Sequence, residues 1–275
     1  MRRFVWLLLC CCGPGTPAVS VAGDEVIPFR EAWGWAVVVP VAVGRSGVHE
    51  FLLDTGTTST LLEPALAAEL GIAATSHANL VTPAGEREVG LGHAELRIGR
   101  TALAGVEVLI AELPAVRSDE RRVRGLLGQS ALSRLEYTID HARRRLVVHA
   151  GHDGGRNPRE WTRPSLEARV GCGRSSARLV IDSGVAMPVL FEQGRRAMAV
   201  ELGGSVRAAT NAGDAVWREG RVDSLCVAGR RAGPLSVVVR PPAPRAREED
   251  GLLPSRFFAR VRLGLAGAVV RVDHW

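Results

Sequence analysis

Short apolar runs bounded by turn-forming residues recur along the whole chain. In residues 35–56 (WAVVVPVAVGRSGVHEFLLDTG) two such runs flank the turn sequence GRSG, and the second run ends on Asp54. Apolar runs of this length around a glycine-containing turn predict a β-hairpin. The segment Glu63–Ile72 follows, and its early proline and final glycine predict a helix.

The same order of elements occurs a second time. Residues 164–184 (PSLEARVGCGRSSARLVIDSG) repeat the strand, turn and strand, and they end on Asp182, 128 positions after Asp54. Each copy later reaches a glycine–leucine motif, 71 positions after Asp54 at Gly125 and 69 positions after Asp182 at Gly251. Two copies with the same elements in the same order indicate a duplicated fold.

The first copy resembles a known family. FLLDTGTTSTLLEPALAAELGI, residues 51–72, is similar to the active-site segment of retropepsin-like and pepsin-like aspartic proteases, as is the later Gly-Leu-Leu-Gly with its short helix and hairpin. The resemblance covers nearly all of the chain from about Ile27 and implies a single-chain, bacterial-type member. The implied fold class is all-β, mainly β with short helices, as two duplicated lobes related by a pseudo-two-fold axis.

The resemblance implies an aspartic endopeptidase that uses Asp54 and Asp182 as its catalytic residues. Two carboxyl groups in contact cannot both ionise, so they share a proton and titrate as a unit. The ionised partner takes a proton from a water that attacks the peptide carbonyl, and the protonated partner hydrogen-bonds the carbonyl oxygen. This chemistry implies a polypeptide substrate and neither cofactor nor metal.

The family also implies supporting roles for the residues around each acid. Hydroxyls and glycines after the acids brace the active-site loops and donate N–H groups, and the glycine motifs hold the loops in position. The loop residues are Thr55, Gly56, Thr57, Ser183 and Gly184, and the glycine motifs are Gly125, Leu126, Leu127, Gly128, Gly251, Leu252 and Leu253.

Two hairpin turns are similar to the flaps that close over such a cleft. A plain surface hairpin is the alternative in both places. The turn residues are Thr82, Pro83, Ala84 and Gly85 in the first copy, and Thr210, Asn211, Ala212 and Gly213 in the second.

The second copy departs from the first at two positions. Val185 replaces Thr57, whose hydroxyl could bond the carboxylate, so we expect a higher pKa for Asp182 and a working range from mildly acidic toward neutral pH. Pro254 replaces Gly128 and removes an N–H that could cap the next helix. These departures leave open a non-catalytic peptide-binding protein on the same scaffold. A different β fold, with the acids in ordinary turns, is a further alternative.

The composition and charge of the chain bear on which kinds of binding partner to expect. The chain has 275 residues and a formal charge of +6, and all 35 of its basic residues are arginine. The charge is spread along the chain, and the densest run, SDERRVR, carries its own acids, which is typical of a solvated loop. We therefore expect no nucleic-acid partner. Each chain supplies both acids, so we expect a monomer.

The first residues predict export. MRRF, a short apolar stretch and SVA before Gly23 are typical of a signal peptide over residues 1–22, and no later segment could span a bilayer. A lipid anchor on one of the early cysteines is the alternative to a periplasmic or secreted protein. The remaining domains are predicted as an N-terminal lobe, 23–149, a linker, 150–164, and a C-terminal lobe, 165–275.

Two cysteines remain after the leader, Cys172 and Cys226. In an oxidising compartment they are a candidate disulfide, and two unpaired thiols are the alternative. His149 and His152 lie in or beside the linker without a further ligand cluster, so a metal site is not predicted.

Overall fold

The computed structural model describes residues 23–45, 47–82, 85–113, 123–150, 163–170, 172–210, 213–241, 249–265 and 268–274. The proposed signal peptide, most of the proposed linker and the proposed flap residues Pro83, Ala84, Asn211 and Ala212 lie outside these ranges.

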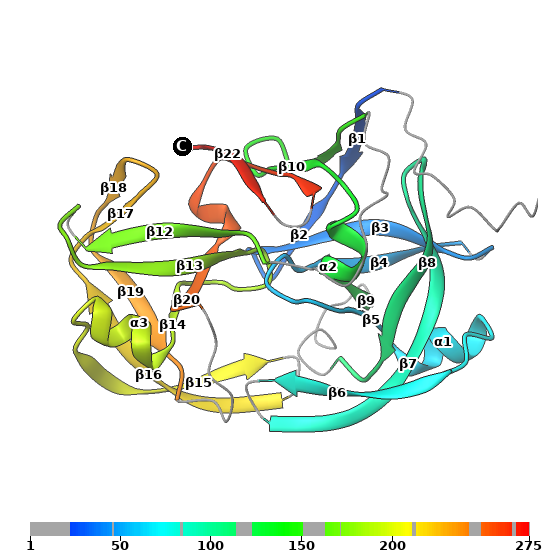
Figure 1. Cartoon of the computed structure of the whole chain (residues 1–275), viewed down its shortest axis with the longest axis horizontal. Helices are drawn as coiled ribbons and strands as arrows, with labels where there is room; N and C mark the ends of the chain where they lie inside the picture. The colour runs from blue at the N-terminus through cyan, green and yellow to red at the C-terminus, as the bar shows by residue number, and fades with distance from the viewer. Residues whose placement is uncertain are drawn as a thin grey trace, which may run out of the picture.

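The chain folds mainly as β-sheet, in two lobes that lie side by side with a third sheet between them (Figure 1). The predicted all-β, two-lobed class is thereby confirmed. The first lobe contains an eight-stranded sheet, in the order β2-β3-β4-β9-β5-β8-β7-β6, and the short helices α1 and α2. Its elements are β2 (Arg30–Ala32), β3 (Ala36–Val43), β4 (Val48–Leu53), β5 (Thr60–Leu62), α1 (Pro64–Glu69), β6 (Ser76–Thr82), β7 (Gly85–Ile98), β8 (Thr101–Ile110), β9 (Val123–Leu127) and α2 (Gln129–Leu132).

The second lobe contains a nine-stranded sheet in the order β15-β16-β19-β14-β20-β13-β12-β17-β18. One helix, α3, packs beside it, and a 3-10 turn, η2, follows β20. Its elements are β12 (Ser165–Val170), β13 (Ser176–Asp182), β14 (Val189–Leu190), α3 (Glu192–Ala197), β15 (Leu202–Thr210), β16 (Gly213–Val222), β17 (Leu225–Val227), β18 (Arg230–Ala232), β19 (Leu235–Val239), β20 (Gly251–Pro254) and η2 (Ser255–Phe257).

The sheet between the lobes draws strands from both halves of the chain. Its central pairing is antiparallel, with Tyr137 opposite Leu263 and Asp140 opposite Arg260. Each of these strands is the hairpin strand that follows the glycine motif of its own copy, so the pairing obeys the pseudo-two-fold relation. The order is β1-β11-β10-β21-β22, with β1 (Glu25–Pro28), β10 (Tyr137–Asp140), β11 (Arg145–Val148), β21 (Arg260–Leu263) and β22 (Val269–Asp273).

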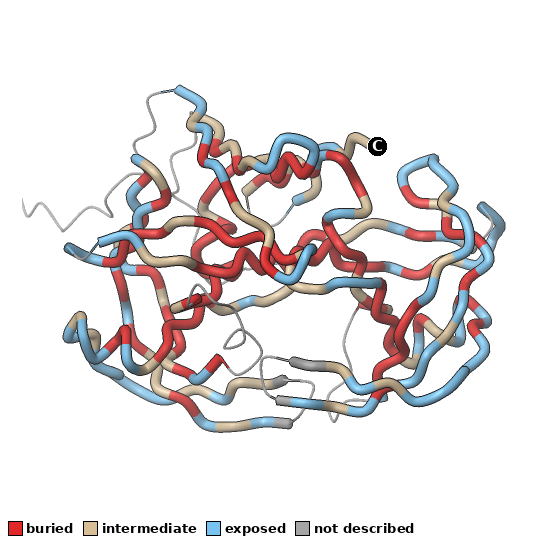
Figure 2. The backbone as a smooth tube through the Cα atoms, turned by 180° about the vertical axis from the view of Figure 1, so that it is seen from behind, coloured by how far each residue is buried: buried red, intermediate tan, exposed pale blue. Residues whose placement is uncertain are grey.

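The local structure follows from the residue pattern. Strand β3 is buried at nearly every position, as expected for a continuous apolar run, whereas β4 is buried only in its last half, Phe51–Leu53. Helix α1 lies inside the predicted helix, begins at Pro64, and is followed by Gly71 at a φ of 67°. One cluster of buried apolar side chains extends through both lobes and the sheet between them, and Figure 2 shows the buried backbone running across the centre.

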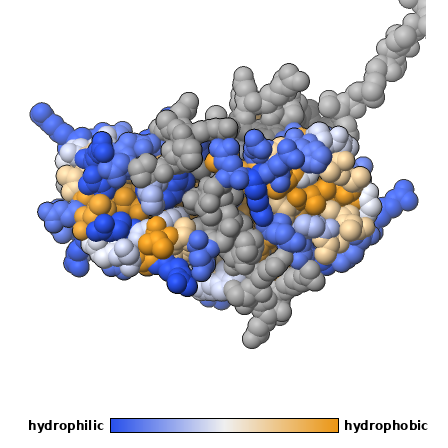
Figure 3. Space-filling model, turned by 90° about the horizontal axis from the view of Figure 1, so that it is seen from below, coloured by the Kyte–Doolittle hydropathy of each residue, from blue (hydrophilic) through white to orange (hydrophobic). Residues whose placement is uncertain are grey.

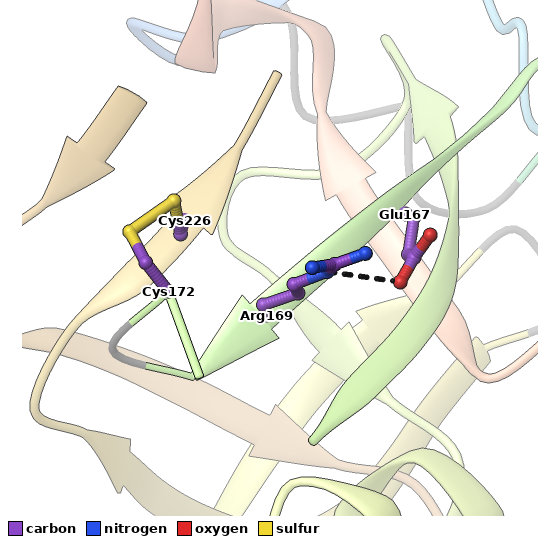
Figure 4. The surroundings of a disulfide bond; sticks show 4 residues. All are labelled: Glu167, Arg169, Cys172 and Cys226. Atoms are coloured by element: carbon purple, nitrogen blue, oxygen red, sulfur yellow. Dashed lines mark hydrogen bonds and ion pairs between the residues drawn. A yellow bond between two sulfur atoms is a disulfide. The ribbon is translucent and has the colours of Figure 1, made fainter. Parts of the chain in front are cut away.

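Cys172 and Cys226 form a disulfide in the second lobe (Figure 4). Cys172 lies in the turn after β12, and Cys226 lies on the adjacent strand β17, opposite Arg169. Arg169 forms an ion pair with Glu167 at 3.0 Å on the same strand. The disulfide therefore joins two neighbouring strands at the outer part of the second lobe.

Candidate active site

The two acids meet where the lobes join. Asp54 directly follows β4, and Asp182 is the last residue of β13, the corresponding strand of the second lobe. Both are buried, with 7% and 5% of their surface exposed, and their carboxyl groups are within hydrogen-bonding contact. Residues 128 positions apart in sequence thus share one small site.

A glycine from each lobe lies against the carboxyl of the opposite lobe. A Cβ on Gly56 would lie 2.2 Å from Oδ2 of Asp182, and a Cβ on Gly184 would lie 2.7 Å from Cγ of Asp54. Each glycine N–H also donates to the acid of its own loop: Gly56 to Asp54 Oδ1 at 3.0 Å, and Gly184 to Asp182 Oδ1 at 2.6 Å. Only glycine allows the two loops to approach this closely.

The residues after the acids bind the lobes together. The Thr55 hydroxyl donates to the Ile181 carbonyl oxygen at 2.6 Å and accepts the Ser183 N–H at 3.1 Å. The Ser183 hydroxyl makes the two equivalent hydrogen bonds from the other lobe. It donates to the Leu53 carbonyl oxygen at 2.6 Å and accepts the Thr55 N–H at 3.1 Å. These four reciprocal bonds are buried and fix the acid loops relative to each other.

The electrostatics of the pair follow from burial. Burial raises the pKa of Asp54 well above its ordinary value, and the neighbouring Asp182 charge raises it further. The backbone N–H groups of Gly56 and Thr57 act in the opposite direction, because they bond the charged form. A carboxyl pair in this setting keeps one proton into the pH range where an exposed aspartate has lost it.

The glycine motifs form the strands beside the acid strands. Strand β9 runs parallel to β4, with Leu127 opposite Leu53, and β20 runs parallel to β13, with Leu253 opposite Ile181. The Asp54 N–H donates to the Leu127 carbonyl oxygen at 3.0 Å. A side chain at Gly125 would clash with Phe51 at 2.2 Å. The motifs therefore contact the acid loops through backbone.

The role suggested for the Gly128 N–H was wrong. It does not cap the next helix but donates to the Thr60 hydroxyl at 3.2 Å. In the second lobe, the pairing of β14 with β20 places Pro188 at the position of Thr60 and Pro254 at the position of Gly128. Proline therefore replaces both the residue that supplies the N–H donor and the residue that supplies the hydroxyl acceptor. Because proline has no N–H, the second lobe has no donor at this place that would need a partner.

Sequence reasoning missed Gln129, which is buried to 1% exposure. Its side-chain amide donates to the Thr55 carbonyl oxygen at 2.9 Å, and it also bonds Tyr137, whose pKa is raised by burial. Gln129 thus connects the sheet between the lobes to the first acid loop. The signal available was its place directly after the glycine motif.

Val185, which replaces Thr57, is partly buried against an apolar cluster of the second lobe that includes Val189 and Trp217. Apolar packing thus takes the place of a hydroxyl on this side of the acids.

The predicted flap hairpins extend from opposite lobes toward the middle of the molecule (Figure 1). Strand β6 pairs with β7 up to Thr82 opposite Gly85, and β15 pairs with β16 up to Thr210 opposite Gly213. Figure 3 views the face carrying these hairpins, where apolar and hydrophilic patches lie on both lobes. The flap function of these residues stays a prediction.

No group of three or more His, Cys, Asp or Glu side chains that could hold a metal ion occurs in the described parts of the chain. His149, one of the two histidines considered for a metal, contacts Thr138 Oγ1 at 2.8 Å and Asp24 Oδ2 at 3.0 Å. These contacts join the residue that follows β11 to strand β10 and to the residue that precedes β1.

Two acid loops meeting on a pseudo-two-fold axis, each supported by a glycine-containing parallel strand, define the class of retropepsin-like aspartic proteases. A family model described as aspartyl protease matches residues 39–131, which places the first lobe in that family. The match supports proteolytic activity in general terms. No curated protein matches the chain.

Proposed function

We propose that the protein is an aspartic endopeptidase that hydrolyses peptide bonds with a water activated by Asp54 and Asp182. The observation that carries the proposal is the contact between the two buried carboxyl groups at the junction of the lobes. A protein that only binds peptides has no need for two adjacent buried acids, whose burial opposes folding when they are charged.

The reaction needs one ionised and one protonated carboxyl. The ionised carboxylate accepts a proton from the water, whose oxygen attacks the peptide carbonyl carbon, while the protonated carboxyl donates a hydrogen bond to the carbonyl oxygen. Collapse of the tetrahedral intermediate breaks the C–N bond, and the leaving nitrogen takes a proton from the pair. The raised pKa of Asp54 supports the presence of this shared proton at mildly acidic to neutral pH.

The test is cleavage of an unstructured protein by the mature chain between pH 2 and pH 8, beside Asp54→Asn and Asp182→Asn. Asp223→Asn is the matched control, because Asp223 is exposed and distant in sequence from both acid loops. We expect loss of activity of at least about a thousandfold in each acid variant, wild-type activity in the control, and inhibition by a statine-type peptide. Peptide binding without cleavage would instead support the non-catalytic alternative, and an optimum near pH 2 would contradict the proposed pH range.

We further propose export as a monomer. Both acids come from one chain, so specific activity should not fall on dilution. The disulfide is compatible with an oxidising compartment, and sequencing the N-terminus of the exported protein would test the proposed cleavage before Gly23. A fatty-acyl cysteine at the mature N-terminus would favour the lipoprotein alternative. Among the described residues, no helix is both long enough and apolar enough to cross a bilayer.

A further inference from the structure

Arg240 is a buried cation in the second lobe. It directly follows strand β19 and is only 6% exposed. Its guanidinium carbon, Cζ, lies over the Phe191 ring, 4.9 Å from the ring centroid. A cation over an aromatic face is favourable, but the ring does not neutralise the charge. Burial lowers the pKa of Arg240, because it disfavours the charged form. The charge at this position therefore opposes folding unless a partner offsets it.

The guanidinium of Arg240 has no acidic partner and donates no hydrogen bond in the part of the chain that the structure describes. By contrast, the largely buried Arg124 pairs with Glu63 at 2.8 Å. Arg163 pairs in the same way with Glu249 at 2.6 Å. The nitrogens of Arg240 are not enclosed, since none of them is among the buried, unbonded polar atoms of the described residues. They can therefore donate to a ligand that reaches them.

The side chain of Arg240 lies on the face of the sheet that carries the predicted flap hairpin. Side chains alternate along a strand, so Arg240 shares the face of Val238. Val238 and Phe191 belong to one apolar cluster. The same cluster takes in Trp217 of the hairpin β15–β16 and Val185 of the second acid loop. This face therefore lies between the acid loop and the hairpin, on the side of the lobe where a substrate chain would bind.

Arg240 lies at a distance from the acids. Asp182 is opposite Pro254 of β20. The Phe191 N–H, beneath the guanidinium, donates to the carbonyl oxygen of Asp250, four positions before Pro254. Four residues of strand span about 13 Å. An extended peptide also needs about four residues to cover this distance, so a substrate group at Arg240 belongs to a residue removed from the cut bond.

The first lobe has no cation at the corresponding place. The Ala111 N–H donates to the Leu62 carbonyl oxygen at 3.0 Å. In the second lobe, the Arg240 N–H donates to the Leu190 carbonyl oxygen at 2.9 Å. Both leucines are opposite the first glycine of the glycine motif in their own lobe. Ala111 is therefore the counterpart of Arg240, and it belongs to a buried apolar cluster of the first lobe.

The acid that the first lobe has beside this place is also missing from the second. Glu63 follows Leu62 and pairs with Arg124. The residue that follows Leu190 is Phe191, whose N–H bonds the strand beside it as the Glu63 N–H does. An aromatic ring thus replaces the carboxylate next to Arg240, and the cation is left for an acid from outside the described chain.

We propose that Arg240 binds the carboxylate of an acidic side chain of the substrate, about four residues from the cut bond and on one side of it only. This inference rests on the proposed peptidase function. A guanidinium can bind a carboxylate through two parallel N–H donors, and a partly buried pair is screened less by salt than an exposed one. Ala111 offers no donor, so the related place in the first lobe gives no preference for an acid.

The test begins with the cleavage sites in an unstructured protein mixture, identified by mass spectrometry, for the wild type and three variants. Arg240→Met keeps an unbranched chain over the Phe191 ring and removes the charge. Arg240→Lys keeps the charge but not the paired N–H donors. Arg231→Met is the matched control, because it removes the same charge from an exposed residue of β18, an edge strand of the same sheet. Thermal unfolding is measured for every variant.

We expect Glu and Asp to be enriched at one place on one side of the wild-type sites. For synthetic peptides with blocked ends, kcat/KM with Glu at that place should exceed kcat/KM with Gln by about tenfold. Arg240→Met should bring this ratio close to one, and Arg231→Met should leave it unchanged. Cleavage of the Gln peptide should stay at the wild-type rate in both. No enrichment of acids in the wild type, or the same ratio in Arg240→Met, would overturn the site and leave the peptidase intact.

If Arg240→Met does not fold, Arg240→Lys carries the test. Loss of the paired donors should lower the ratio of Glu to Gln cleavage by about threefold or more. An unchanged ratio in Arg240→Lys would then overturn the site.

A wild type that cuts nothing would contradict the proposed peptidase, and binding then decides the site separately. Fluorescence anisotropy of the full-length chain would give Kd for a labelled neutral peptide and for versions with one Glu moved along it. Binding about tenfold tighter with Glu at one place, and weakened there by Arg240→Lys, supports the site. Equal Kd values at all places, or no effect of Arg240→Lys, overturn it.

Discussion

Gly56 of the first lobe lies against the Asp182 carboxylate of the second, so closely that a Cβ would come within 2.2 Å of Oδ2. Gly56→Ala should therefore push the acid loops apart. We expect a loss of activity of at least about a hundredfold, since displacement of a catalytic group by about 1 Å has an effect of this size. Peptide cleavage and thermal unfolding would be measured together. Gly47→Ala is the control, because nothing lies within 4 Å of its Cβ position; equal activity of the two variants would contradict the close approach.

The reciprocal bonds of Thr55 and Ser183 make a second prediction. Thr55→Val removes a hydroxyl that serves the Ile181 carbonyl oxygen and the Ser183 N–H, and it leaves both groups buried. Each unsatisfied group costs about 1–3 kcal/mol, so denaturant unfolding should show a loss of several kcal/mol. Thr55→Ser keeps the hydroxyl and should retain most of the stability. Loss of the same size in both variants would mean that the hydroxyl is not the cause.

The raised pKa of Asp54 predicts how stability depends on pH. Its folded state holds a proton more tightly than the unfolded chain, so this contribution to stability is fully present below the ordinary pKa of 3.8. It is lost as pH rises through the higher folded pKa. Between pH 4 and pH 7, Tm should therefore fall more for the wild type than for Asp54→Asn. Asp223→Asn, the exposed control, should follow the wild type, and parallel curves for all three proteins would refute the assignment.

The two prolines of the second lobe, Pro188 and Pro254, predict that substitutions at these two positions have coupled effects on stability. Thr60→Val in the first lobe leaves the Gly128 N–H without its hydroxyl acceptor and should cost about 1–3 kcal/mol. In the second lobe, Pro254→Gly alone would introduce an N–H facing Pro188 and should also destabilise. Adding Pro188→Thr supplies the missing acceptor and should restore part of the loss. A double-mutant cycle by urea unfolding measures this coupling, and strictly additive effects would count against it.

The disulfide predicts a redox dependence of stability. Cys172→Ser with Cys226→Ser should lower the free energy of unfolding by about 2–4 kcal/mol, because the bond closes a loop of 54 residues. A reducing agent should lower the Tm of the wild type to about that of the double variant and leave the Tm of the double variant unchanged. An equal fall in Tm for both proteins would mean that the reducing agent does not act through this disulfide.

The sequence predicted the features that repeat. The two acids, the strands that carry them, the glycine motifs and the duplicated order could all be inferred because the second copy repeats the spacing of the first. Contacts between distant residues could not. Nothing local marks Thr60 as the acceptor of the Gly128 N–H, or relates Pro188 to Pro254, because strand pairing alone brings them together.

The functional surroundings of the acids were also beyond sequence reasoning. Gln129 reaches the acid loop from the start of a helix, and its role depends on the fold around Tyr137.

The antiparallel contact of β10 with β21 is one that two identical half-chains could make with each other. In such a homodimer every substitution would appear on both sides of the axis and would have to suit both. A single gene encoding both halves removes that obligation. One half can then keep the hydroxyl of Thr60 where the other half has Pro188, and the partner of each residue can change with it.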